Sequence, residues 1–289
     1  MPRAHRAPRA LLVSPLLALA MLWPLAGGVS ARGEEAPDAV GAGTARPIAY
    51  DVSYPQCGKE LPDTFAFAIV GVNGGRVYSA NRCLGAGDQP SLLAWAGRNA
   101  QLYANTGNPG PRMSRYWPTE QDSPRICTDD DPDTRSCAYN YGWNAAADSY
   151  ATALAAYVSL GWAEADATRL PDENTWWLDV ETANSWRADP GLNVAALRGA
   201  VDYLESMGAP EVGFYSAPRM WERITGGTDY FADHPSWVAG ATTLQGALRV
   251  CRSEGFTGGP VTMAQYLLGG LDANVVCEMP PAEADSLSN

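Results

Sequence analysis

Residues 175–181 read Thr-Trp-Trp-Leu-Asp-Val-Glu, an apolar and aromatic run that ends in two carboxylates separated by one valine. In a β-strand, alternate side chains point to the same side of the sheet. A strand at this position would therefore place Trp177, Asp179 and Glu181 on one face. The opposite face would carry Trp176, Leu178 and Val180. The stretch thus predicts a buried strand with a pair of acids at its carboxyl end.

Paired acids at the end of an apolar strand have two interpretations. A parallel α/β protein places its chemistry at the carboxyl ends of its strands, where Asp179 and Glu181 stand. Their Cα atoms would be about 6.8 Å apart, which is two strand rises. The same pair also fits a solvated strand end without a function. The residues at the ends of the other predicted strands distinguish between these two interpretations.

The first 31 residues have the composition of a secretory signal peptide. Three arginines precede an apolar run over residues 11–25, and small residues follow at positions 29–31. This order is typical of signal peptides, and the run is too short and too interrupted by proline for a permanent membrane span. We expect cleavage before Arg32 and a secreted, extracellular mature chain.

The remaining residues divide into three parts. Residues 32–45 are rich in Gly, Ala and Glu without periodicity, which predicts a flexible linker. Residues 46–280 are long enough for a single α/β domain. Residues 281–289 are expected to form a disordered tail.

The charge of the protein limits its partners. The 289-residue chain carries a net charge of −12, and loss of a signal peptide with three arginines and no acid would leave −15. Such an acidic surface disfavours nucleic acid and anionic membranes. We expect a monomer that needs no cofactor, although composition names no substrate.

The six cysteines all follow the expected signal peptide, which favours three disulfides over free thiols. Fifteen pairings are possible in principle. Nearness in the sequence favours Cys127–Cys137, Cys57–Cys83 and Cys251–Cys277. A zinc site is the alternative, but there is no C-x-x-C pair and His234 is the only histidine beyond the signal peptide.

Hydrophobic patterning predicts strands that alternate with helices. Strands are expected over residues 47–53, 65–72, 101–104, 175–181, 211–216, 236–240, 261–266 and 273–276. Helices are expected over residues 90–98, 150–158, 197–207 and 218–224, with Gly161 and Gly208 as stops. Residues 105–141 show no period, and a loop of this length in a compact domain is usually functional.

This alternation predicts either a doubly wound sheet or a barrel. No glycine-rich phosphate loop follows the first strand, and polar residues stand at the ends of several strands, which favours a barrel. The late connections are too short for full helices. We therefore expect an irregular (β/α) TIM-like barrel.

Four acids fall at expected strand ends: Asp51, Asp179, Glu181 and Asp272. A barrel would bring them to one pocket, where their mutual repulsion would raise the pKa of at least one. Glycoside hydrolysis needs such a set, with one acid to protonate the leaving oxygen and one carboxylate to stabilise the sugar cation or direct the attack. Flat surfaces for sugar rings could come from Trp177, Trp186, Tyr215, Trp237 and Tyr266, although such aromatics are more often core.

In the same order along the chain, five short motifs resemble those of glycoside hydrolase family 25, the secreted lysozymes with an irregular (β/α) barrel. They are D-V-S-Y-P-Q at residues 51–56, L-D-V-E at 178–181, F-Y-S at 214–216, W-V-A at 237–239, and A-Q-Y followed by D-A-N-V at 264–275. The resemblance covers about residues 50–276. Each motif is short, and the five motifs in this order are more specific to the family than any single one of them.

The resemblance implies a role for each matching residue. Glu181 would be the general acid, and Asp179 would assist charge development or position the N-acetyl group of the substrate. The substrate-binding residues would be Asp51, Asp272, Tyr215, Gln265, Trp186 and Trp237. The implied reaction is cleavage of the β-1,4 bond between N-acetylmuramic acid and N-acetylglucosamine in peptidoglycan, without a metal.

The chain departs from the family pattern at three places. Residues 71–75 replace an acidic turn after the second strand, and residues 103–106 replace an aromatic–histidine pair after the third. The third is the long segment 105–141 with its cysteines. All three touch the expected substrate groove.

Three alternatives to a hydrolase remain open. The first is a glycan-binding module that has lost turnover. The second is a Ca²⁺ or Mg²⁺ site built from the four acids, although the chain lacks a D-x-D-x-D-G loop. The third is a set of structural carboxylates at loop starts, which fits one or two of the acids more easily than four.

Overall fold

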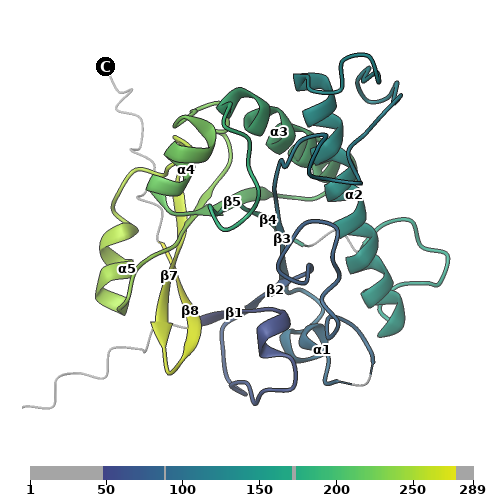
Figure 1. Ribbon diagram of the computed structural model, residues 1–289. Helices are drawn as coiled ribbons and strands as arrows, with labels where there is room; N and C mark the ends of the chain where they lie inside the picture. The colour runs from purple at the N-terminus through teal and green to yellow at the C-terminus, as the bar shows by residue number, and fades with distance from the viewer. Residues whose placement is uncertain (1–47, 88, 171–173, 278–289) are drawn as a thin grey trace, which may run out of the picture. The chain divides into compact units, whose positions relative to one another are not determined.

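The computed structural model describes residues 48–87, 89–170 and 174–277. The expected signal peptide (1–31), linker (32–45) and tail (281–289) lie outside the described residues. Within them, eight strands close into one barrel in the order in which they occur in the sequence (Figure 1). An α/β barrel was the expected fold, and it is confirmed.

The strands are short, and most of them are shorter than the ranges expected from the sequence. They are β1 (Ala49–Val52), β2 (Ala68–Gly71), β3 (Gln101–Asn105), β4 (Trp176–Asp179), β5 (Val212–Ser216), β6 (Ser236–Val238), β7 (Val261–Leu268) and β8 (Leu271–Val276). Neighbours from β1 to β7 are parallel. β8 runs antiparallel to both β7 and β1.

Five helices connect the parallel strands. They are α1 (Leu92–Ala96), α2 (Arg135–Ser159), α3 (Pro190–Ser206), α4 (Pro218–Thr225) and α5 (Leu244–Val250). The connection from β1 to β2 holds only a 3-10 turn, η1 (Tyr54–Gln56), and the one from β7 to β8 is a tight hairpin. The barrel is therefore irregular, as expected. The short helix α5 has no counterpart among the sequence predictions.

The reversal of β8 depends on two glycines. Leu268 pairs with Leu271, which leaves Gly269 and Gly270 as a two-residue loop with φ angles of 60° and 82°. Tight hairpin turns that match the twist of the strands need positive φ at both central residues, a conformation that glycine adopts without a steric cost. The last strand can therefore fold back on β7 without a crossover helix.

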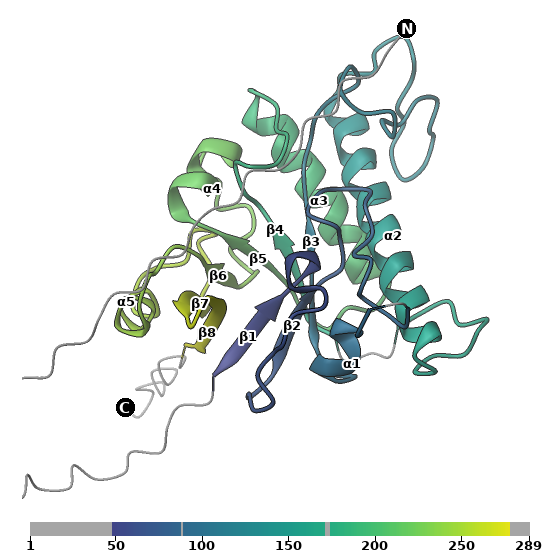
Figure 2. The same ribbon diagram turned by 60° about the horizontal axis from the view of Figure 1, so that its bottom comes forward.

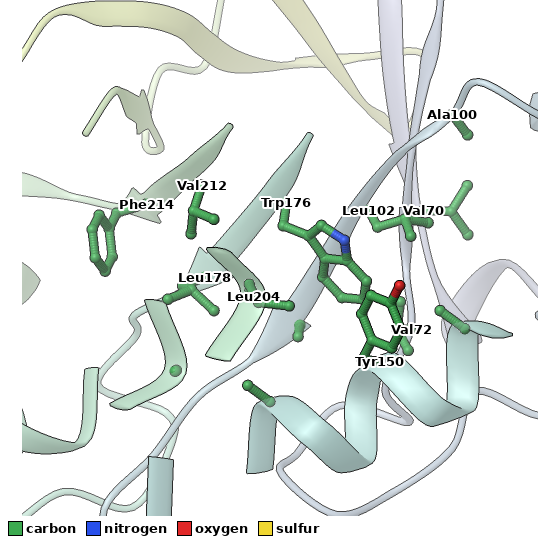
Figure 3. Packing of buried hydrophobic residues seen from close by; sticks show 14 of the residues in the cluster. Val70, Val72, Ala100, Leu102, Tyr150, Trp176, Leu178, Leu204, Val212 and Phe214 are labelled. Carbon is green, nitrogen blue, oxygen red and sulfur yellow. The ribbon is translucent and has the colours of Figure 1, made fainter. Parts of the chain in front are cut away.

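The outward face of β4 packs against the surrounding helices. Trp176 and Leu178 are fully buried between the sheet and α2 and α3, and the ring of Trp176 stacks on Tyr150 at 6.0 Å between centroids (Figure 3). Burial of an aromatic or leucine side chain contributes roughly 1.5–3 kcal/mol. This layer is the main hydrophobic core, and it fixes β4 in place.

Helices α2 and α3 lie side by side and touch through their backbones (Figure 2). A Cβ at Gly142 would lie 1.8 Å from the carbonyl oxygen of Ala196, and one at Gly199 would lie 2.0 Å from the carbonyl oxygen of Tyr139. Only glycine permits this approach. The two helices thus pack more closely than ordinary side chains allow.

The sequence predicts a loop over residues 105–141, and both of its predicted boundaries are wrong. Asn105 belongs to β3, and α2 begins at Arg135. The side-chain oxygen of Thr134 caps α2 by accepting a hydrogen bond from the backbone N–H of Cys137 (3.2 Å). The sequence concealed this start because the first turns of α2 carry no apolar period. We call residues 106–134 the insertion loop.

The insertion loop is packed against α2. Trp117 stacks on Tyr141 at 5.1 Å, and its indole N–H donates to the carbonyl of Pro132 (2.8 Å). Arg187 and Asp133 form an ion pair that joins the loop to the segment before α3. The loop is therefore an ordered part of the barrel mouth.

Three disulfides join the pairs that nearness in the sequence favoured. Cys57–Cys83 links the loops that follow β1 and β2, Cys127–Cys137 ties the insertion loop to α2, and Cys251–Cys277 joins α5 to the end of β8. In the described part of the chain, no helix combines the length and the apolar character of a membrane span.

The contact between α2 and α3 gives a test of the packing. Alanine at Gly142 should improve helix propensity by about 1 kcal/mol, yet its methyl group would overlap the backbone of α3. Overpacking usually costs 1–3 kcal/mol, so after the gain in helix propensity we expect Gly142→Ala to lower the free energy of unfolding by about 1 kcal/mol in denaturant titrations. Ala151→Ser, at an exposed position of α2, should change it by less than about 0.5 kcal/mol. A stabilised Gly142→Ala protein would contradict the close approach.

Candidate active site

The two faces of β4 are divided as the sequence predicts. Trp176 and Leu178 face the helices, whereas Trp177 joins the cluster inside the barrel. Asp179 is the last residue of β4 and lines the mouth, one layer above Trp177. Glu181 follows in the loop and is partly buried. The alternation of the strand thus separates packing from chemistry.

All four acids line one pocket of about 270 Å³ at the mouth of the barrel: Asp51, Asp179, Glu181 and Asp272. The rest of its wall is polar and aromatic. It consists of Val52, Ser53, Pro55, Gln56, Tyr103, Tyr215, Trp237 and Gln265. We call it the acidic pocket.

The antiparallel direction of β8 brings Asp272 to this pocket. In a strand parallel to the others, a residue at the start would lie at the opposite end of the barrel from the ends of β1 and β4. Because β8 is reversed, Asp272 lies directly opposite Asp51 in the register. Opposed residues of an antiparallel pair have Cα atoms about 4.5–5.5 Å apart. The reversal therefore places two carboxylates side by side.

Asp51 is held by amide side chains from β7 and β8. Gln265 donates to both of its oxygens (3.1 and 3.0 Å), and Asn274 donates to one (2.6 Å). These amides are oriented in turn, because the Tyr215 hydroxyl donates to the Gln265 carbonyl oxygen and the Trp237 indole donates to that of Asn274. The network fixes which end of each amide faces Asp51.

Despite these donors, the pKa of Asp51 is raised to about 7. Burial is the largest cause, and the charge of Asp272 adds to it, whereas the hydrogen bonds from Asn274 and Gln265 oppose it. Desolvation disfavours the charged form of a carboxyl group. Asp51 therefore exchanges its proton near neutral pH.

Asp179 is the most deeply buried acid of the pocket. Asn105 donates a hydrogen bond to one carboxyl oxygen, and the other has no partner among the described residues. Burial, the charge of Glu181 and the charge of Asp51 raise its pKa well above the ordinary value. The protonated form is favoured, and the unpartnered oxygen can carry that proton.

Glu181 is more accessible than Asp179. Burial and the charge of Asp272 raise its pKa. The loop that carries it is fixed by Trp186, whose indole N–H donates to the backbone carbonyl of Glu181 (2.8 Å). Glu181 thus keeps a proton to a higher pH than a solvated glutamate, which is what a general acid needs.

The aromatic candidates have different locations. Tyr215 and Trp237 line the acidic pocket, although Trp237 is almost completely buried and packs on Trp177 and Tyr215. Trp186 does not line it and instead supports the Glu181 loop. Tyr266 faces the outer core and is not part of the pocket.

Several residues of the pocket were not assigned from the sequence. Tyr103 lines it, Asn105 binds Asp179, and Asn274 binds Asp51. Tyr103 and Asn105 alternate on β3 as Trp177 and Asp179 do on β4. The register pairs them across the two strands, so this alternation was the signal that could have identified them.

Two glycines make room for the large rings inside the barrel. A Cβ at Gly213 would lie 2.4 Å from the Trp177 ring, and one at Gly71 would lie 2.6 Å from the Tyr103 ring. The register places each glycine beside the ring that it accommodates. Large and small residues thus alternate around the barrel, and Tyr103 can extend under the pocket.

Among the described residues, no three His, Cys, Asp or Glu side chains are placed to bind a metal ion together. Asp51 and Asp179 have oxygens engaged by amide N–H donors, which compete for the lone pairs that a cation would need. The raised pKa values favour protonated carboxyl groups, which proton donation to a bound ligand would require.

The sequence comparisons bear out the resemblance to glycoside hydrolase family 25. No protein-family model matches the sequence. Over 63 residues the chain is 36% identical to "Probable GH family 25 lysozyme 4" of Dictyostelium discoideum. The match spans 22% of this chain and 29% of that relative's length.

Comparison with solved structures finds muramidases and lysozymes. A muramidase from Trichobolus zukalii has a TM-score of 0.46 at 14% identity, over 81% of this chain and 94% of that chain. A bacterial lysozyme from Streptomyces coelicolor has a TM-score of 0.47 at 15% identity, over 81% and 93%. A muramidase from Acremonium alcalophilum has a TM-score of 0.47 at 15% identity, over 80% and 93%. Structural similarity at these TM-scores does not strengthen the conclusion drawn from the sequence match.

The raised pKa of Asp179 predicts a pH-dependent stability. The proton bound by folded Asp179 contributes stability that is fully present below the unfolded pKa of about 3.9 and is lost as the pH rises through the folded pKa. Asparagine cannot ionise and can still accept the hydrogen bond from Asn105. We expect Asp179→Asn to unfold with a higher free energy than wild type at pH 8, and with no higher free energy at pH 4.

Denaturant titrations at pH 4, 6 and 8 measure this difference. Asp63→Asn, at an exposed position outside the acidic pocket, is the matched control and should show no such pH dependence. An Asp179→Asn protein that is less stable than wild type at pH 8 would show that Asp179 is ionised in the folded protein.

Proposed function

We propose that the protein is a divergent member of glycoside hydrolase family 25 that cleaves β-1,4 bonds of peptidoglycan between N-acetylmuramic acid and N-acetylglucosamine. One observation carries the proposal. Four carboxyl groups line one open pocket, burial raises the pKa values of all four, and the charge of a neighbouring acid adds to this for Asp51, Asp179 and Glu181. Protonated and ionised carboxyl groups can then coexist at neutral pH, as glycoside hydrolysis requires.

In the proposed reaction, Glu181 donates its proton to the glycosidic oxygen as the bond from that oxygen to the anomeric carbon breaks. Positive charge develops on the sugar ring, and the ionised acids of the pocket stabilise it. Water adds to the anomeric carbon and returns its proton to a carboxylate. Bond cleavage is thus balanced by one water, and no metal is needed.

Asp179 has a supporting role in this proposal. Its protonated form can donate a hydrogen bond from the oxygen that has no protein partner. A sugar N-acetyl group offers a carbonyl acceptor for that bond, and binding it would position the substrate. Asp51 and Asp272 would bind sugar and tune the other two acids, with Gln265 and Tyr215 beside them.

The location of the protein is part of the proposal. We infer that the mature chain acts outside the cell, on a cell-wall glycan. Disulfides form in oxidising compartments, and all six cysteines are paired. The acidic composition supports a glycan partner over nucleic acid.

Replacement of Glu181 tests the proposal directly. Glutamine keeps the size of the side chain but cannot donate a proton from a carboxyl group, and general acids contribute about 10²–10⁴-fold to rate. We expect Glu181→Gln to lower the release of reducing sugars from purified peptidoglycan by about 10³-fold while circular dichroism and melting stay unchanged. Glu254→Gln, at an exposed position outside the pocket, is the control and should keep wild-type activity. Equal activity of Glu181→Gln and wild type would overturn the assignment.

The pH profile tests the coupling between acids. The charge of Asp272 raises the pKa of Glu181, so its removal should lower that pKa. Because the general acid must be protonated, the basic limb of the kcat/KM profile should move to lower pH in Asp272→Asn. A basic limb that stays in place would show that Glu181 is not the group that titrates, whatever happens to the absolute rate.

A second candidate is a glycan-binding module without turnover. It is favoured by the turn after β2, where residues 71–75 replace the acidic turn of the family and the side-chain oxygen of Asn73 accepts a hydrogen bond from the backbone of Asn105 (2.7 Å). Mass spectrometry of products after long incubation with defined peptidoglycan separates the two. Binding without any product would support the module, and any Glu181-dependent product would exclude it.

A further inference from the structure

A second and larger pocket, of about 690 Å³, is lined in part by the loop that carries Glu181. Its walls come from the loops after β2 and β4, from the insertion loop after β3, and from Tyr141 of α2. We call it the basic pocket, because its charged lining residues are Arg76 and Arg115 and no carboxylate lines it. In a chain with a net charge of −12, a pocket with only positive charges is an exception.

The two pockets are neighbours along the same loops. Glu181 lines the acidic pocket, and Ala183, two residues later, lines the basic one. Two residues span at most about 7 Å of chain. Tyr54 lies between residues of the acidic pocket in the sequence, and its ring lies against Gly75 of the basic pocket. A ligand bound at Glu181 can therefore extend into the basic pocket.

The charges of the basic pocket are not neutralised by the protein. Among the described residues, neither Arg76 nor Arg115 forms an ion pair with a carboxylate. Arg115 donates to the hydroxyl of Tyr116 (2.6 Å), and its guanidinium lies 4.7 Å from the centre of that ring. These contacts orient Arg115 but leave its positive charge available for an anion.

Two further features indicate a binding site. The side-chain N–H₂ of Asn184, a lining residue, is buried and has no acceptor among the described residues. Tyr78 has a φ of 55°, a left-handed conformation that is unfavourable for a residue with a side chain, and its ring stacks on Tyr116 at 4.2 Å. Such conformations often mark functional sites. The result is a rigid aromatic wall beside two cations and a free donor.

We propose that the basic pocket binds an anionic substituent attached to the glycan, and that this substituent is a carboxylate of the peptide that peptidoglycan carries on its sugars. This deepens the proposed function and rests on it. Arginine pairs well with carboxylates, and the pocket lies one loop away from where the sugar would be cleaved. A phosphate on a wall polymer shares this chemistry and is the other possible source.

Direct binding tests the proposal independently of turnover. The probe is a disaccharide that lacks the cleavable bond and carries a four-residue peptide, measured by calorimetry against the full chain. We expect the free carboxylate form to bind at least about tenfold more tightly than the same fragment with its carboxylates converted to amides. The double variant Arg76→Gln/Arg115→Gln should lose this difference, whereas Arg252→Gln, at an exposed position outside both pockets, should keep it.

The outcomes separate the site from the reaction. Equal binding of the charged and amidated fragments, or an unchanged preference in the double variant, overturns the proposal for the peptide. A glycerol phosphate oligomer that binds in an arginine-dependent way, while the peptide fragment does not, assigns the site to phosphate. Arginine-dependent binding without hydrolysis by wild type would overturn the proposed function alone. Hydrolysis that depends on Glu181, without any arginine-dependent binding, would overturn only the proposal that the basic pocket binds an anionic substituent.

Discussion

The reversal of the last strand is the constraint on which the candidate site depends. A two-glycine turn sends β8 back along β7, and β8 then pairs with β1 to close the barrel. The same pairing places Asp272 opposite Asp51 and brings Asn274 within reach of Asp51. Closure of the barrel and assembly of the acidic pocket are therefore one structural event.

The acidic pocket is a balance between repulsion and polar support. Burial and like charges raise the pKa values of its acids, while amides from Asn105, Gln265 and Asn274 hold their oxygens. Hydrophobic packing elsewhere must offset the cost, and the outward face of β4 together with the close contact of α2 and α3 does so. A locally destabilised site within a protein that is stable as a whole is common where side chains must exchange protons.

Much of this arrangement could be predicted from local patterns. Alternation identified the two faces of β4, and apolar runs identified the strands. Three features were not predicted from the sequence. The direction of β8 and the amide hydrogen bonds to Asp51 depend on contacts between distant residues. The first turns of α2, before Tyr150, have no apolar period. A strand pattern reads the same in both directions, so the sequence could group Asp272 with the other acids but could not show that β8 must be reversed to bring it there. The basic pocket was missed because its arginines lie in loops, where no period groups them.

The pairing of β1 with β8 also limits when the protein can fold. These are the first and last strands of the barrel, and Asp51 meets Gln265 and Asn274 across more than 200 residues of chain. A nascent chain that lacks β8 leaves one edge of β1 unpaired and Asp51 without the hydrogen bond from Asn274. Neither the barrel nor its acidic mouth can form until β8 has been synthesised, so the chain before β8 stays open until then.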